Sequence, residues 1–248
     1  MKVSLLGPLA VSVGRKPVRL QRPRQRAMMA ILALYANRTV RTDTIIDMIW
    51  GCSPPPAARN QVQVQVSHIR KTLRTAGAAD VVETQPDGYL LRLEPAACDF
   101  TVFTALESVG EMARKEHRYR AASEAFRLAL RAWSGPALAE RRLAVFQRWV
   151  DLEIGLDRHA RLLPELFQAV RAEPLDEDLC LRLMACLQRS GRIADALKTY
   201  RRTRQTLRRE LGIDPHPTLQ SAEAAILRGD LIEHPNWSFL ELEPSLLS

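Results

Sequence analysis

Strand-forming sequence is confined to the first hundred residues of this chain, and every later periodic segment has helical spacing. The β-prone segments are residues 3–6, 9–13, 17–20, 81–84 and 89–93. With 248 residues the chain is near the upper end for one domain. We therefore expect a mainly α protein with a small β component, made of a mixed part (1–98) and an all-helical part.

Three helical segments lie between the two groups of strands. They are expected at residues 23–35, 43–50 and 57–76. The proline run 54–56 must end the second of them. Pro86-Asp87-Gly88 then supplies turn residues for a hairpin. The order of three strands, three helices and a hairpin is that of a winged helix-turn-helix.

The second part of the chain is predicted to form consecutive helices. They are expected at residues 99–117, 119–133, 139–157, 159–172, 176–190, 192–210 and 217–228. Two helix-pair boundaries, at Arg158-His159 and Gly191-Arg192, lie 33 residues apart, which is close to the tetratricopeptide period. We expect residues 99–230 to form stacked, tetratricopeptide-like helices. Residues 231–248 are predicted to be a tail that is either mobile or docked through Trp237 and Phe239.

The positive charge of the chain is concentrated in its first part. The formal net charge is +8; residues 1–98 hold 14 Lys/Arg and 6 Asp/Glu, and residues 99–248 hold 22 of each. A localised positive field favours a polyanionic partner, because each neutralised phosphate releases condensed counterions. The alternative is a basic surface that only aids solubility.

The segment 57–76 has one apolar and one polar side. Val62, Val66, Ile69 and Leu73 recur at steps of four, three and four, and form one stripe that is expected to face inward. The opposite side, together with Gln63 on its flank, combines groups suited to reading base edges in a major groove, namely Asn60, Val64, Ser67, His68 and Lys71. A solvated amphipathic helix is the alternative, but the flanking elements and the charge favour DNA.

Other residues are expected to contact the DNA backbone, which positions a protein without reading sequence. Arg59 lies near a helix start, where the positive end of the helix dipole also favours binding of a phosphate. Arg24 and Arg26 cluster at the first helix. The hairpin residues Thr84, Gly88 and Arg92 are placed to reach a phosphate or an adjacent minor groove. Taken one at a time, the residues at the first helix and on the hairpin are better explained as ordinary surface residues, but together they are consistent with positioning contacts.

The motifs of several enzyme classes are missing from the sequence. It has no phosphate-binding loop, no dinucleotide-binding glycine pattern, no zinc-protease His pair and no serine-hydrolase elbow. The four cysteines lack metal-ligand spacing, and no apolar run approaches the roughly 18 residues that a spanning helix needs. We expect no catalytic residues, no metal, no cofactor, no membrane contact and a cytoplasmic, nucleoid-associated location.

Six motifs together carry a resemblance to a known family. They are Leu6-Gly7-Pro8-Leu9, Ala58-Arg59-Asn60-Gln61-Val62, Ser67-His68-Ile69-Arg70-Lys71, Asp87-Gly88-Tyr89-Leu90-Leu91, Trp133-Ser134-Gly135 and Glu210-Leu211-Gly212-Ile213-Asp214-Pro215. Their order over residues 2–228 resembles the Streptomyces antibiotic regulatory protein family, pathway-specific transcription activators of actinobacteria. The resemblance implies a winged helix followed by a bacterial transcriptional activator domain.

The resemblance also implies partners and roles. Such proteins bind direct repeats at promoters as two adjacent protomers, activate antibiotic biosynthesis and recruit RNA polymerase holoenzyme. In this chain Arg70 would then point toward the DNA backbone, and the loop with Trp50, Gly51, Ser53 and Pro55 would contact the sigma subunit. Two other functions remain open from the sequence: a repressor at the same DNA site, or a helical-repeat adaptor that binds no DNA.

Overall fold

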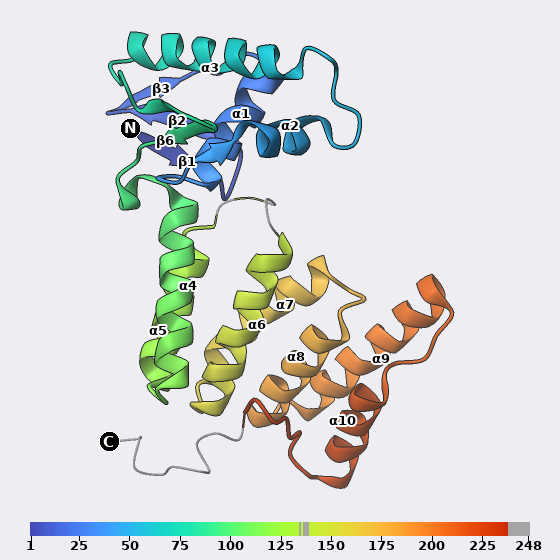
Figure 1. Ribbon diagram of the computed structural model, residues 1–248. Helices are drawn as coiled ribbons and strands as arrows, with labels where there is room; N and C mark the ends of the chain where they lie inside the picture. Colours follow the sequence, from blue (N-terminus) through green and yellow to red (C-terminus); the bar gives the residue numbers. More distant parts are fainter. Residues whose placement is uncertain (134, 136–138, 238–248) are drawn as a thin grey trace. The chain divides into compact units, whose positions relative to one another are not determined.

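The computed structural model describes residues 1–133, 135 and 139–237 (Figure 1). The chain divides into two compact units. Unit 1 comprises Met1–Val109 and Leu128–Arg142, and unit 2 comprises Gly110–Arg127 and Leu143–Ser248. Three helices, α4 (Asp99–Lys115), α5 (Tyr119–Arg131) and α6 (Ala139–Gly155), contribute to both units. The predicted domain boundary at residue 98 therefore stays a prediction.

Unit 1 begins with the predicted antiparallel meander. Its strands are β1 (Lys2–Ser4), β2 (Ala10–Val13) and β3 (Lys16–Val18), which pair in the order β1-β2-β3. Val3 lies opposite Val11, and Val11 lies opposite Val18, so that one buried row crosses the sheet. Gly14 closes the β2–β3 turn at a φ of 58°, a conformation that favours glycine.

Three helices follow at the predicted places. They are α1 (Pro23–Leu34), α2 (Thr42–Trp50) and α3 (Ala58–Thr75), and each packs against the other two. Pro23 is the first residue of α1, where its missing N–H costs no helical hydrogen bond. The apolar stripe of α3 is buried in the core of unit 1, as its spacing predicts. The opposite side of α3 forms one edge of unit 1 (Figure 1).

A second small sheet carries the hairpin. Its strands β4 (Val40–Arg41), β5 (Val82–Gln85) and β6 (Gly88–Leu91) pair in the order β4-β6-β5. The hairpin was predicted, although Gly88 belongs to the strand and not to the turn. Strand β4 was not predicted from the sequence, because a two-residue strand shows no alternation. The arrangement confirms the winged helix-turn-helix.

The first residue of α4 is hydrogen-bonded to the segment that follows β1. The Asp99 carboxylate accepts hydrogen bonds from the backbone N–H groups of Leu5 (2.7 Å) and Leu6 (3.2 Å). A short 3-10 turn, η1 (Pro95–Ala97), precedes it. An N-terminal carboxylate also complements the helix dipole. Unit 1 therefore continues into the helical sequence beyond residue 98.

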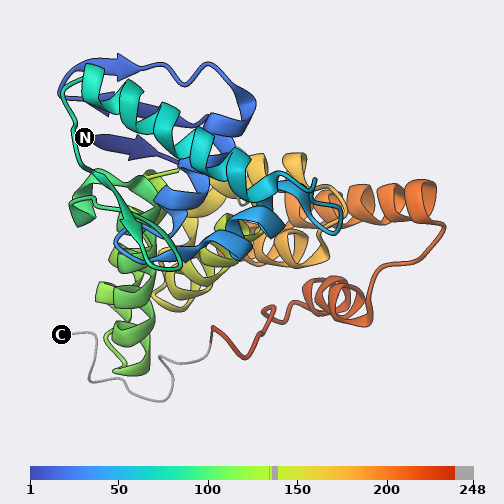
Figure 2. The same ribbon diagram turned by 45° about the horizontal axis from the view of Figure 1, so that its top comes forward.

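Helices account for the regular structure of the described part of unit 2. Its later elements are α6 (Ala139–Gly155), η2 (His159–Leu162), α7 (Leu163–Ala172), α8 (Glu177–Arg189), α9 (Ile193–Leu211) and α10 (Pro217–Arg228). Helix α8 packs against α7, α9 and α10, and is buried from Leu179 to Gln188 (Figures 1 and 2). The segment predicted as one helix over 159–172 starts as the 3-10 turn η2, because Pro164 stands at the start of α7.

The segment after α10 is docked on unit 2. The Gln188 side chain donates to the carbonyl of Asp230 (2.6 Å) and accepts from the N–H of Ile232 (2.9 Å). Trp237 is buried, and its indole N–H donates to Asp151 (2.8 Å). Of the two alternatives for the tail, docking through Trp237 is the one observed, and Phe239 lies outside the described residues.

Candidate nucleic-acid interface

The outward side of α3 is a continuous exposed stripe. Asn60, Gln63, Val64, Ser67 and Lys71 are exposed on it, and Val64 shows 40% of its surface to solvent. The predicted exposure is thus present for five of the six residues assigned to base reading. The stripe offers amide, hydroxyl and ammonium groups beside one apolar side chain, which is the mixture that distinguishes base pairs in a major groove.

The sixth residue, His68, lies at the margin of this stripe. It is only half exposed, and its Nδ1 atom is buried without a hydrogen-bond partner among the described residues. Three residues earlier, Gln65 is buried and its Oε1 lacks a partner in the same way. Both lie on the flank of α3, between the buried and exposed sides. His68 is therefore less accessible than the helical wheel predicts.

Arg70 connects α3 to the hairpin. Its Nε donates to the carbonyl of Val82 (2.9 Å), and its Nη2 donates to the hydroxyl of Thr84 (2.8 Å). From the sequence, a DNA-backbone contact is predicted for Arg70 and another for Thr84. In the structure they bind each other, so that the hairpin is held beside α3 by the flat, five-donor guanidinium group.

An open groove runs between α3 and the hairpin. The groove brings together five residues of the predicted site, Gln63, Ser67, Arg70, Lys71 and Thr84, with Val66, Tyr89 and Arg74. Arg74 is exposed and was missed by the sequence analysis. Its spacing is the signal that would have found it, because Arg74 lies seven residues after Ser67 and three after Lys71, on the same side of the helix.

Four of the remaining predicted backbone contacts are exposed arginines, three of which have partners within the protein. Arg24 donates to the Oε1 atom of Gln61 (2.8 Å) and lies over the Trp50 ring, 5.6 Å from its centroid. Arg59 pairs with Asp43 at 2.6 Å. Arg92 pairs with Glu83 on the hairpin, which raises the pKa of its guanidinium further above its ordinary value. Exposed pairs of this kind exchange partners at little cost.

Gly88, another of the predicted backbone contacts, is buried and not exposed. It is buried in β6 opposite Arg41, and a Cβ atom added to it would lie 1.9 Å from the carbonyl oxygen of Val40. The glycine therefore permits the close approach of β4 and β6 and does not face solvent.

The loop assigned to the sigma subunit lies between α2 and α3. Gly51 and Ser53 are exposed, whereas Trp50 and Pro55 are half buried. Gly51 has a φ of 62°, and its N–H donates to the carbonyl of Asp47 (2.8 Å), which ends α2.

The described residues show no arrangement that suggests metal chemistry or a membrane span. They contain no group of three or more His, Cys, Asp or Glu side chains that could hold a metal ion. Burial raises the pKa of the Cys180 and Cys186 thiols to about 12, so that both are protonated near neutral pH. Across the same residues, none of the helices is both long enough and apolar enough to cross a bilayer.

Two protein-family models match the chain. The transcriptional regulatory protein, C-terminal model matches residues 15–91, and the bacterial transcriptional activator domain matches residues 98–141 and 136–227. Together these matches cover most of the winged helix and the helices that follow it.

Three relatives illustrate the similarity. The regulatory protein DnrI of Streptomyces peucetius is 33% identical over 253 residues, which covers 93% of each chain. The transcriptional regulatory protein EmbR of Mycobacterium tuberculosis is 34% identical, over 90% of this chain and 62% of EmbR. The regulatory protein AfsR of Streptomyces coelicolor is 33% identical, over 93% of this chain and 24% of AfsR. The chain thus spans nearly all of DnrI and less than two thirds of the other two.

A solved structure has the same fold. The structure of Mycobacterium tuberculosis EmbR in complex with a low affinity phosphopeptide aligns with a TM-score of 0.79 at 33% sequence identity. The alignment covers 94% of this chain and 66% of the EmbR chain.

Proposed function

The chain belongs to the Streptomyces antibiotic regulatory protein family of transcription activators, and on this premise we propose that it binds direct repeats in promoter DNA and recruits RNA polymerase holoenzyme. We infer further that the regulated genes belong to a secondary-metabolite, antibiotic pathway. Such a regulator is expected in the cytoplasm, at the nucleoid. The observation that carries the proposal is the exposed polar stripe of α3 beside the groove that contains Arg70, Lys71 and Arg74.

Base reading is assigned to the α3 stripe. Lys71 donates to acceptors such as guanine O6 and N7, and Asn60 and Gln63 each present the paired donor and acceptor that match adenine. Ser67 reads either type of base pair, and Val64 contacts a thymine methyl group. His68 contributes only at the margin, because it is half buried.

Backbone contacts are assigned to the arginines around the stripe. Arg24, Arg26 and Arg59 lie at the starts of α1 and α3, and Arg92 lies on the hairpin. Because an exposed ion pair is weak, Arg59 and Arg92 leave their carboxylates readily for a phosphate. A further backbone contact is assigned to Arg74, which lies in the groove beside Lys71. Arg70 and Thr84 act by holding the hairpin beside α3.

Polymerase recruitment is assigned to the α2–α3 loop. Gly51 and Ser53 are exposed there, and the nearby Met48 shows 46% of its surface to solvent. A small contact with the polymerase suffices, because about 1.4 kcal/mol of binding free energy changes a binding constant tenfold. Two protomers side by side on a direct repeat would each present this loop.

The first test separates a DNA binder from an adaptor. Genomic fragments flanking the chain's own gene are screened by footprinting, and the affinity for the protected duplex is measured against salt. With about six phosphate contacts the log–log slope is expected near −5. An adaptor would give no footprint and no salt-dependent binding, and either result would refute DNA binding.

The second test separates activation from repression. In vitro transcription from the protected promoter is measured with RNA polymerase holoenzyme, with and without the protein. Activation predicts more transcript, whereas less transcript would make the protein a repressor. Ser53→Glu should keep the footprint and lose the increase, with Lys115→Ala, on α4, as a control that keeps both.

A further inference from the structure

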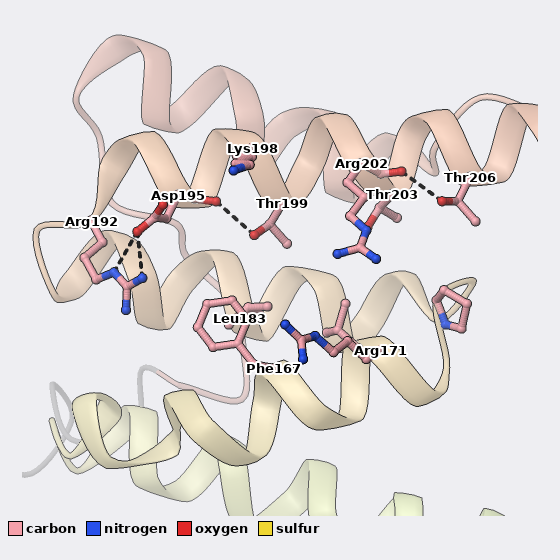
Figure 3. A pocket seen from close by; sticks show the side chains of 12 residues that line it. Phe167, Arg171, Leu183, Arg192, Asp195, Lys198, Thr199, Arg202, Thr203 and Thr206 are labelled. Atoms are coloured by element: carbon pink, nitrogen blue, oxygen red, sulfur yellow. Dashed lines mark hydrogen bonds and ion pairs between the residues drawn. The ribbon is translucent and has the colours of Figure 1, made fainter.

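Unit 2 contains a cavity that no step of the proposed DNA recognition uses. It lies between α7, α8 and α9 and has a volume of about 280 Å³ (Figure 3). Phe167 and Val170 of α7 and Leu183 of α8 give it an apolar floor. We call it the α7–α9 cavity.

The rim of the α7–α9 cavity is positively charged. Four of its lining residues are basic and one, Asp195, is acidic. Asp195 is already paired with Arg192, whose guanidinium also lies over the Phe167 ring, 5.8 Å from the centroid. That leaves three cations, Arg171, Lys198 and Arg202, which have no carboxylate partner among the residues that the structure describes.

Two of these cations converge on one space. Arg171 extends from α7 and Arg202 from α9, and both guanidinium groups point into the gap between the two helices (Figure 3). Like charges that face one another across a partly enclosed space repel, and an anion placed between them converts the repulsion into two attractive contacts.

The other polar groups of the cavity wall have partners of their own. The Thr199 hydroxyl donates to the carbonyl of Asp195 (2.9 Å), and the Thr206 hydroxyl donates to the carbonyl of Arg202 (3.0 Å). Recognition of a ligand therefore falls to the three cations and to the apolar floor. The volume is near the lower end of the roughly 300–1,000 Å³ of small-molecule sites, which is too small for a folded partner.

We propose that the α7–α9 cavity binds a small organic anion with an aromatic or aliphatic body. Its carboxylate, sulfonate or phosphate group lies between Arg171, Lys198 and Arg202, and its apolar body lies on Phe167 and Leu183. The proposal does not depend on DNA binding, because all of these residues belong to unit 2 and none is assigned to the α3 stripe.

The probe for the test is 8-anilinonaphthalene-1-sulfonate, an aromatic anion whose fluorescence rises in apolar sites. The full chain is titrated with it, and N-phenyl-1-naphthylamine, which lacks the sulfonate, is titrated in parallel. We expect saturable binding of one sulfonate probe per chain, and binding of the neutral probe that is at least about tenfold weaker.

Matched arginine variants locate the site. Arg202→Gln should weaken binding of the sulfonate probe about fivefold, and Arg171→Gln with Arg202→Gln about tenfold or more. Arg201→Gln, which makes the same change on the neighbouring residue of α9 outside the cavity, should leave binding unchanged. Equal melting temperatures of the three variants establish that all are folded.

Three results would overturn the proposal. The first is equal affinity of the wild type and the Arg171→Gln, Arg202→Gln double variant. The second is neutral-probe binding as tight as that of the sulfonate. The third is displacement of the sulfonate probe by an acidic peptide but not by small aromatic carboxylates, which would make the cavity a peptide site.

Discussion

Gly88 illustrates how a single residue determines the geometry of the hairpin. A Cβ atom at this position would collide with the β4 backbone, at 1.9 Å from the Val40 carbonyl oxygen. We expect Gly88→Ala to lower the free energy of unfolding by about 1–3 kcal/mol through overpacking, as measured by urea denaturation. Asp87→Ala, at the neighbouring exposed turn position, should change it by less than about 0.5 kcal/mol. Equal effects of the two substitutions would contradict the steric explanation.

The four cysteines differ in accessibility, and burial raises the thiol pKa of two of them. Cys52 is exposed, and Cys98, Cys180 and Cys186 are buried. Since burial raises the pKa of Cys180 and Cys186 to about 12, their reactive thiolate form is scarce at pH 8 and increases only as the pH rises toward that value. Iodoacetamide at pH 8, followed by peptide mass spectrometry, should label Cys52 in the native protein. Labelling of Cys180 at the same rate would contradict this expectation.

A buried ion pair links α6 to α8. Both Nε and Nη2 of Arg182 donate to the Asp151 carboxylate, at 2.8 and 2.9 Å. Arg182→Met leaves that carboxylate uncompensated and should cost about 3–5 kcal/mol of unfolding free energy, whereas adding Asp151→Leu to it should recover part of the loss. Urea denaturation of the wild type and the two variants measures both effects. A single-variant cost below about 1 kcal/mol would show that the pair contributes little.

Elements whose apolar pattern repeats several times could be predicted from the sequence, and short or irregular elements could not. Helix α3 was predicted within about a residue at each end because its apolar stripe repeats over about three turns. Strand β4 was missed, and the bond between Arg70 and Thr84 joins residues on two elements whose distance no local pattern encodes. For the same reason, periodicity left the docking of Trp237 on Asp151 undecided.

At the scale of elements, Arg70 is expected to control the mobility of the hairpin. Arg70→Gln removes the guanidinium bonds to Val82 and Thr84. Backbone amides of β5 and β6 should then exchange faster with solvent, while those of α8 stay unchanged, as followed by hydrogen exchange. Lys71→Gln, at the adjacent exposed position, is the matched control. Unchanged exchange in the hairpin would contradict the connecting role of Arg70.

At the scale of the whole molecule, the charge pattern was visible in the sequence, but the accessibility of individual charges was not. The positive excess of residues 1–98 is carried largely by arginines that remain exposed, and the neutral remainder forms helices with many internal ion pairs. The α7–α9 cavity was not anticipated at all. Arg171 lies on α7, and Lys198 and Arg202 lie on α9, so that only the packing of α7 on α8 and of α8 on α9 brings the two helices' cations together.

The central claim is that the outward side of α3 reads DNA sequence. The most direct measurement is the ratio of dissociation constants for a random duplex and the footprinted duplex, at one salt concentration, for Lys71→Ala and for the control Lys115→Ala. Because a good base contact contributes about 1–3 kcal/mol of discrimination, the ratio should fall about tenfold in Lys71→Ala and stay at the wild-type value in the control. A Lys71→Ala protein with the wild-type ratio would contradict the claim.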